Sequence, residues 1–269
     1  MPHPYFSLSV PISIGHRGAA GELPENTLES FARGLADGAS ILETDLHPTR
    51  DGALVLFHDD DVARTTDGRG PISAMTLAEA KRLDAGYGFS AEQGFPWRGK
   101  GLRVPTLEEA LDRFPGVRFN IEIKETAPGV IDRTLATLSE KGRSELTLLA
   151  AEKDAIMASI RETAARAASG VAIGACVGEV VRCIQAARDH TAPPPGVMAL
   201  QIPAAFAGRP LATPELVSFA HRHGIQVHVW TVNDPAEMDA LLDVGVDGLI
   251  SDHPARVREV LRSRGVGVP

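Results

Sequence analysis

Short apolar runs alternate with segments of helical spacing from one end of this 269-residue chain to the other. Eight runs are typical of β-strands: 12–16, 41–46, 118–123, 146–150, 171–176, 197–202, 226–232 and 248–251. Between and after them, eight segments space their apolar residues as helices do: 25–37, 107–114, 129–140, 153–165, 179–188, 214–223, 235–244 and 254–262. Strands that alternate with covering helices form a parallel sheet, and eight such strands close it. The alternation therefore predicts an α/β fold, a (β/α)8 TIM barrel.

A turn signal at 49–52 interrupts the alternation after the second run. A further apolar run follows it and ends in His58, which predicts a β-hairpin. If an Asp-Gly pair forms a two-residue turn, Arg50 pairs with Ala53. Counting back along both strands then places Asp45 opposite His58.

The longest irregular stretch is 59–103, which is rich in glycine and charge and has one helix-like piece at 76–84. It is too long for a plain loop and short for an independent domain. Barrels of this class form single domains of roughly 200–250 residues. We therefore predict one barrel domain over residues 1–269, with 59–103 as an insertion after the second strand.

The composition limits which cellular compartment and which classes of binding partner are expected. No apolar run reaches the ~18 residues of a membrane span, and the first residues do not resemble a signal peptide. Cys176 and Cys183 match no metal or redox motif and fit a reducing compartment. A net charge of −8 with no Lys/Arg run disfavours a nucleic-acid partner. We expect a cytoplasmic protein without stable membrane insertion, and the sequence leaves its oligomeric state open.

Carboxylates stand where a barrel interior normally carries aliphatic side chains. Glu43 and Asp45 lie two apart in the second strand, so both side chains point to one face. Glu122 lies among apolar residues in the next strand of the barrel. Three carboxylates make an oxygen-only site, which favours Mg²⁺, Ca²⁺ or Mn²⁺ over Zn²⁺. The alternative is that these acids face solvent or pair with Arg and Lys.

Two histidines and two cations stand at the same end of the predicted barrel. His16 ends the first strand, and the hairpin brings His58 beside Asp45. Because the imidazole pKa lies near working pH, the pair suits general acid and general base catalysis. Arg17 and Lys124 are suited to binding a phosphate, and both can also pair with the carboxylates. The other seven histidines are predicted to be surface or supporting residues.

Two further polar positions end later strands. Gln201 and Trp230 are candidate substrate-binding residues at the sixth and seventh strands. The chain has no G-x-S-x-G elbow, no Walker loop and no G-x-G-x-x-G turn between a strand and a helix. Serine nucleophile catalysis and nucleotide binding are therefore disfavoured, and the positive groups around a cation favour phosphoryl chemistry.

An ordered set of motifs closely resembles the glycerophosphodiester phosphodiesterase family. The motifs are 15–18 (Gly-His-Arg-Gly), 24–27 (Pro-Glu-Asn-Thr), 43–45 (Glu-Thr-Asp), 57–59 (Phe-His-Asp), 64–66, 105–109, 122–124, 230–233 and 247–252. The resemblance implies divalent-metal-dependent hydrolysis of a small glycerophosphodiester to glycerol 3-phosphate and an alcohol. Carried over by position, it implies metal ligands at Glu43, Asp45 and Glu122. It likewise implies a catalytic pair in His16 and His58, with phosphate binding by Arg17 and Lys124.

The resemblance leaves several points open. At 151–154 the chain reads Ala-Glu-Lys-Asp where such proteins commonly carry a Ser-Phe-Asp-like stretch, which puts the preferred alcohol in doubt. The sequence does not decide which histidine is the base. Nor does it decide whether water or a neighbouring glycerol hydroxyl attacks. The alternative functions are a related barrel phospholipase, C-like or D-like, acting on a lipid or lysolipid, and a non-catalytic phosphodiester-binding module.

Overall fold

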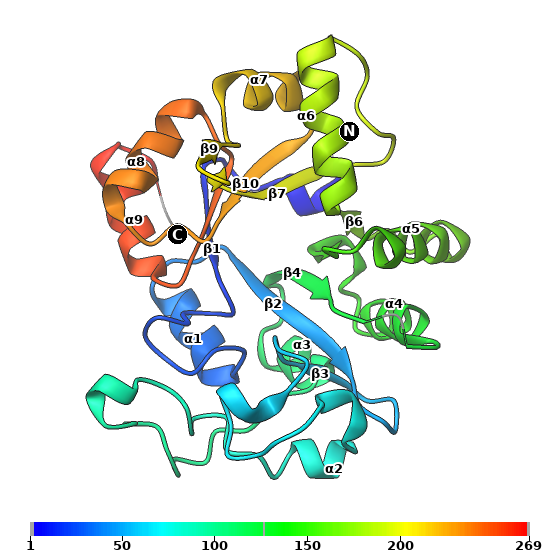
Figure 1. Ribbon diagram of the computed structural model, residues 1–269, viewed down its shortest axis with the longest axis vertical. Helices are drawn as coiled ribbons and strands as arrows, with labels where there is room; N and C mark the ends of the chain where they lie inside the picture. The colour runs from blue at the N-terminus through cyan, green and yellow to red at the C-terminus, as the bar shows by residue number, and fades with distance from the viewer. Residues whose placement is uncertain (1–2, 126, 268–269) are drawn as a thin grey trace.

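The computed structural model describes residues 3–125 and 127–267, and its centre is a barrel of parallel strands (Figure 1). The neighbouring strands follow the order β6-β5-β4-β2-β1-β11-β10-β7, and every neighbouring pair is parallel. The strands are β1 Ile12–Gly15, β2 Ile41–Pro48, β4 Arg118–Ile123, β5 Thr147–Ala150, β6 Ala172–Ile173, β7 Ala199–Pro203, β10 Gln226–Trp230 and β11 Gly248–Ser251. The prediction of an eight-stranded α/β barrel is confirmed.

The barrel is nearly but not fully closed. Within the described chain, β6 and β7 share no strand pairing. One backbone hydrogen bond, from Met198 N to Ile173 O at 3.1 Å, bridges the two edges. The run predicted at 171–176 is a strand over only two residues, because one of its sides lacks a partner strand.

Helices surround the barrel and begin at the signals that the sequence carries. Thr27, Thr106 and Thr213 each accept a backbone N–H from the first turn of the helix that follows. The helices are α1 Leu28–Ala36, α2 Leu77–Ala80, α3 Leu107–Arg113, α4 Val130–Glu140, α5 Asp154–Ala167, α6 Val177–Asp189, α7 Pro214–Arg222, α8 Pro235–Val244 and α9 Pro254–Ser263. Short 3₁₀ turns lie at Pro4–Phe6, Val62–Arg64, Ile72–Ala74, Ala91–Gln93 and Ser144–Leu146, and a small hairpin pairs β8 Ala205–Phe206 with β9 Arg209–Pro210. In the described residues, no helix has the length and apolarity needed to cross a bilayer.

The interior of the barrel changes from apolar to charged along the strands. At the amino end, Ile14 is paired with Ile41, and the fully buried Tyr5 packs against this apolar layer. Side chains alternate between the two faces of a strand, so the next inward positions are His16 and Glu43. The apolar layer therefore supports a polar layer at the carboxyl ends of the strands.

The hairpin after β2 forms, but its predicted register is wrong by one residue. Strand β3, Leu54–Leu56, pairs antiparallel with the end of β2, and Phe57 rather than His58 stands opposite Asp45. The turn has three residues, because Gly52 adopts a φ of +87° and Thr49 N bonds to Ala53 O. Glycine tolerates this left-handed conformation, so the Asp-Gly pair forms the end of a longer turn and not a two-residue turn.

Residues 59–103 cover β3 and form the cyan segment of Figure 1. Their apolar side chains pack against β3 in a separate cluster that includes Val55, Val62 and Ile72. An isolated bridge between Asp61 and Pro71 closes its first loop. This packing holds the residues that follow β3 next to the barrel mouth.

Candidate active site

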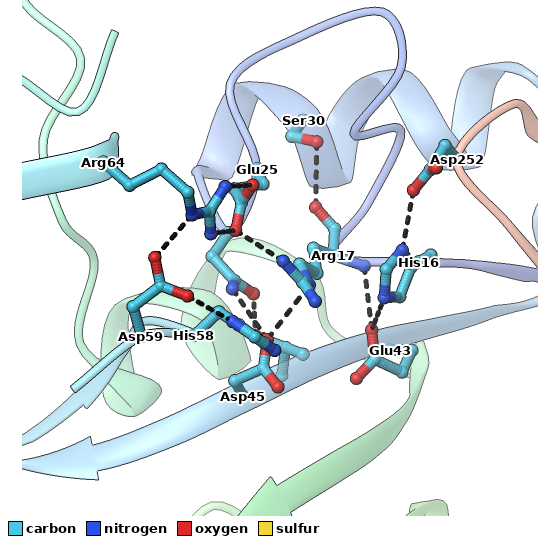
Figure 2. Close-up of polar contacts among 12 residues, drawn as sticks. His16, Arg17, Glu25, Ser30, Glu43, Asp45, His58, Asp59, Arg64 and Asp252 are labelled. Atoms are coloured by element: carbon cyan, nitrogen blue, oxygen red, sulfur yellow. Dashed lines mark hydrogen bonds and ion pairs between the residues drawn. The ribbon is translucent and has the colours of Figure 1, made fainter. Parts of the chain in front are cut away.

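Charged side chains gather at the carboxyl ends of β1, β2 and β4. Strand register explains the grouping: Asp45 of β2 is paired with Glu122 of β4, and Gly15 of β1 is paired with Leu42, which places His16 level with Glu43. Sequence-distant residues therefore meet in one layer. Figure 2 shows His16 and Arg17 facing Glu43 and Asp45 across this layer.

His16 is held by an aspartate from the last strand of the barrel. Its Nδ1 lies 2.6 Å from Asp252 Oδ1, and its Nε2 lies 4.0 Å from Glu43 Oε2. Burial opposes a charged imidazole, but the hydrogen bond to Asp252 and the charge of Glu43 outweigh it and raise the pKa of His16. Asn233 donates to the second oxygen of Asp252 at 2.6 Å and accepts the Asp252 backbone N–H. The imidazole is thus fixed with Nε2 facing the carboxylates.

His58 is held by the residue that follows it. Its Nδ1 lies 2.6 Å from Asp59 Oδ1, and Arg64 Nε donates to the other oxygen of Asp59 at 2.5 Å. Burial alone would raise the pKa of Asp59, but its hydrogen bonds to Arg64 and His58 lower that pKa to about 2. Arg64 also donates to both oxygens of Glu25, at 2.7 and 2.8 Å (Figure 2). A fixed carboxylate therefore orients this histidine too.

Arg17 joins the turn after β1 to three carboxylates. Its backbone N–H donates to Glu43 at 2.9 Å, its guanidinium donates to Glu25 at 2.7 Å, and its Nε lies 3.4 Å from Asp45. The turn is tight: Arg17 has a φ of +48°, and a Cβ on the following Gly18 would lie 2.5 Å from Ser30 Oγ. Only glycine allows this close approach between the turn and α1.

Glu43 and Asp45 form a buried carboxylate pair with opposite pKa shifts. Burial and the neighbouring Asp45 raise the pKa of Glu43 to about 7. Burial also opposes the charge of Asp45, but Lys124 and Arg17 outweigh it and lower the pKa of Asp45. Asp45 further accepts a hydrogen bond from Asn26 at 3.0 Å. Lys124 and Arg17 therefore favour the charged form of Asp45, whereas burial and Asp45 disfavour the charged form of Glu43.

Lys124 lies between two of the predicted metal ligands. Its Nζ is 3.0 Å from Asp45 and 2.9 Å from Glu122, and despite burial these two charges raise the pKa of Lys124. A cavity of about 280 Å³ opens beside it. The cavity is lined by His58, Asp59, Asp60, Glu122, Ile123, Lys124, Glu152, Lys153 and Ile156. The size suits a small molecule at the mouth.

A group of three residues near the same cavity could hold a metal ion. One ligand atom each from His47, Asp60 and Glu125 lies within 4.8 Å of the others, an arrangement consistent with a divalent cation. Over residues 3–125 and 127–267, Glu43, Asp45 and Glu122 do not form a second group of this compactness. His47 is predicted from the sequence to be a surface or supporting residue; its side chain is fully buried, so the surface alternative is wrong.

Gln201 and Trp230 lie on the other arc of the barrel. Gln201 is in β7, and both polar atoms of its amide are buried without a hydrogen-bond partner in the described chain. Trp230 ends β10 with its side chain 44% exposed. Neither of them lines the cavity beside Lys124.

The roles of the residues that support the site were not predicted from the sequence. No individual role is predicted from the sequence for six residues that lie in the family motifs: Glu25, Asn26, Asp59, Arg64, Asn233 and Asp252. Their sequence signals are a position just after β11 for Asp252, the position after His58 for Asp59, and a place within the short family motifs. The partnership of His16 with Asp252 joins residues 236 positions apart, which no spacing reveals.

A family model and the known relatives of this chain point to the same protein family. Residues 16–256 match the glycerophosphoryl diester phosphodiesterase family. The chain is 32% identical, over 94% of its length and 98% of the relative's, to a glycerophosphodiester phosphodiesterase of Caldanaerobacter subterraneus subsp. tengcongensis. It is 25% identical, over 93% of its length and 86% of the relative's, to a Homo sapiens protein named lysophospholipase D.

A solved structure resembles the whole barrel. It is an Oleispira antarctica phosphodiesterase in complex with the product sn-glycerol-3-phosphate. The two share 28% identity with a TM-score of 0.74, covering 94% of this chain and 97% of the other.

Proposed function

This chain belongs to the glycerophosphoryl diester phosphodiesterase family, and from that premise we propose that it hydrolyses glycerophosphodiesters with the aid of a divalent cation and two histidines. It is accordingly a phosphoric diester hydrolase, with glycerol 3-phosphate and an alcohol as products. The observation that carries the mechanism is the pair of histidines, His16 and His58, each held by an aspartate beside the buried carboxylates.

The carboxylates fit a hard divalent cation. Glu43 is buried next to Asp45, and burial together with the Asp45 charge raises the pKa of Glu43 to about 7. An oxygen-only donor set with Glu122 favours Mg²⁺ or Ca²⁺, with Mn²⁺ as a further candidate. We propose that these three residues hold the ion. When bound, it would polarise the phosphoryl group and offset its charge.

The chain's own cations would bind the phosphate. Arg17 presents a planar guanidinium and Lys124 an ammonium group on the same layer, so both can donate to phosphate oxygens. Their present partners are carboxylates at 2.7–3.4 Å. We propose that an entering phosphodiester takes over part of these contacts.

His16 and His58 would transfer the protons. One removes a proton from the attacking hydroxyl, and the other protonates the leaving alcohol. In each, the Nδ1 contact to an aspartate leaves Nε2 to face the substrate. The assignment of base and acid stays open, as does the choice between water and a neighbouring glycerol hydroxyl as the attacker.

A second candidate substrate class is a lysophospholipid. The relative named lysophospholipase D favours it. Glu152 and Lys153 line one edge of the cavity, where the sequence departs from the family pattern. We propose that the leaving alcohol binds at this edge. Gln201 and Trp230 remain candidates for contacts with the other parts of the substrate.

The proposed binding partner and compartment are those expected from the sequence. We propose that the partner is a small molecule and not a nucleic acid, that the chain has no stable membrane insertion, and that the compartment is the cytoplasm. Two buried cysteines that form no disulfide support a reducing compartment.

Product analysis tests the reaction. The purified chain is incubated with glycerophosphodiesters of choline, ethanolamine, glycerol and inositol, and with a lysophospholipid. Glycerol 3-phosphate is measured by a coupled assay, and ³¹P NMR resolves any cyclic phosphate. We expect glycerol 3-phosphate, loss of activity with EDTA, and recovery with Mg²⁺ or Ca²⁺. Release of the alcohol's phosphate ester instead of glycerol 3-phosphate would contradict the proposal.

Calorimetry with two variants tests the ligand assignment. Glu43→Gln should abolish saturable binding of the activating ion, whereas Glu140→Gln, an exposed position on α4, should bind it as the original chain does. Equal affinity in Glu43→Gln would refute the role of Glu43.

A further inference from the structure

His47, Asp60 and Glu125 form a compact group beside the hairpin of β2 and β3. We propose that these three residues bind a first-row transition-metal ion, Zn²⁺ in the simplest case, at a site separate from the Glu43–Asp45–Glu122 carboxylates. His47 Nδ1 lies 3.4 Å from Glu125 Oε1. Two ligands of a tetrahedral Zn²⁺ with bonds of about 2.1 Å lie about 3.4 Å apart. The observed spacing therefore fits ligands of one ion.

The orientation of His47 supplies a free lone pair at that point. Its Nε2 lies 3.1 Å from the carbonyl oxygen of His58, and because a carbonyl only accepts, Nε2 carries the proton. In neutral imidazole the other nitrogen, Nδ1, is then unprotonated. Nδ1 is buried without a hydrogen-bond partner in the described residues, and the side chain is fully buried. Metal-binding histidines commonly donate their second nitrogen to a backbone carbonyl in this way.

The two acidic residues complete the group from separate loops. Glu125 lies just beyond β4, and Asp60 lies just beyond β3. Asp60 is exposed, so its side chain is able to turn toward an ion. A nitrogen with two carboxylates suits Zn²⁺ and its neighbours better than Mg²⁺ or Ca²⁺, which prefer oxygen alone. The donor set thus differs in kind from that of the catalytic carboxylates.

An ion here would fix the loop that carries His58. His47 already contacts the His58 carbonyl, and Asp60 lies two residues further along. Binding both sides of this short segment would hold the His58–Asp59 pair against β2 and β4. The site itself rests on geometry alone and does not depend on the reaction proposed above.

Metal titration of the chelator-treated full chain tests the site, with Zn²⁺ and Co²⁺ as probes. We expect calorimetry to detect a Zn²⁺ site in the original chain, and Co²⁺ to show a visible d–d band from a nitrogen-containing site. Asp60→Asn should weaken Zn²⁺ binding at least about 10-fold, since even loss of an outer partner of a metal ligand costs 10–100-fold. It should also remove the rise in Tm that Zn²⁺ gives. Because Asp60 is exposed, this variant removes a ligand without disturbing the core.

Three further variants make the result specific. His47→Gln and Glu125→Gln should lose the same Zn²⁺ site. Glu43→Gln should keep it, and His223→Gln, an exposed histidine after α7, is the matched control. Unchanged Zn²⁺ affinity in Asp60→Asn and Glu125→Gln would overturn the proposal. So would loss of the Zn²⁺ site in Glu43→Gln alone, because the ion would then bind at the catalytic carboxylates.

Discussion

The two histidines of the site are each oriented by an aspartate, yet they are built from different parts of the molecule. His16 and Asp252 stand at the ends of two adjacent barrel strands, and Asn233 supports the aspartate from a third. His58 and Asp59 are chain neighbours beyond β3, and their support, Arg64, comes from the segment that follows. The His16 side chain is 17% exposed and the His58 side chain 31%. The first pair depends on the barrel, and the second on the packing of residues 59–103.

Removing either imidazole should have the largest effect. His16→Ala and His58→Ala should each lower kcat about 10²–10⁴-fold, because each histidine transfers a proton in the proposed reaction. The fold should stay intact by circular dichroism. His223→Ala serves as the control. Full activity in either variant would show that the replaced histidine is structural and transfers no proton.

Replacing the orienting aspartates should separate the two pairs. In Asp252→Asn one carboxamide oxygen must serve two donors, His16 and Asn233, so we expect a fall in kcat of about 10²–10⁴-fold, as when a buried orienting carboxylate is lost. In Asp59→Asn the site is more open and water can replace the lost acceptor. We expect a smaller fall, about 10–10²-fold. Initial-rate kinetics at saturating substrate measures kcat for both variants. An equal fall in kcat would contradict the proposed difference between the two His–Asp pairs.

Arg64 should be coupled to one pair and not to the other. Arg64→Lys loses the planar guanidinium that bridges Glu25 and Asp59, so we expect kcat to fall about 3–10-fold through looser orientation of His58. Combined with Asp59→Asn, the effects should fail to add by about 0.5 kcal/mol or more. Combined with Asp252→Asn, they should add. Additivity in both double variants would contradict the separate support of the two pairs.

The smallest expected effect is on stability in acid. The pKa of Asp59 is about 2 in the folded chain and lies near 4 when unfolded, so its charged form stabilises the fold above pH 4. That contribution is lost as the pH falls from about 4 toward 2, and solvent screening limits it to about 1 kcal/mol or less. Urea unfolding at pH 5 and pH 3 should show a smaller loss in Asp59→Asn than in the original chain. Asp189→Asn, exposed at the end of α6, should lose as much stability as the original chain.

Prediction from the sequence succeeded where the signal is local. The strands 118–123 and 248–251 are found with the predicted bounds, because each apolar run is sharply enclosed by polar or turn residues. The hairpin register failed by one residue, because an Asp-Gly pair fits both a two-residue turn and the end of a three-residue turn. The difference lies in the conformation of Gly52, which the sequence does not specify.

The candidate site was predictable in its charges but not in its supports. Glu43, Asp45 and Glu122 were visible because carboxylates are rare on an inward strand face. The contact between His16 and Asp252 depends on the order of strands around the barrel, and that of His47 with Asp60 and Glu125 on the path of two loops. Such contacts are consequences of the closed fold and have no periodic signature.

In the part of the chain that the structure describes, one backbone hydrogen bond, from Met198 N just before β7 to Ile173 O of β6, joins the two ends of the sheet, so the barrel keeps two strand edges. The strands that carry most of the charged layer, β4, β2, β1 and β11, are the middle four of that sheet. Thermal fraying of a sheet begins at its edges, where backbone groups lack a second partner strand. The charged layer therefore lies on strands that have a partner strand on both sides, and the two free edges of the sheet lie away from it.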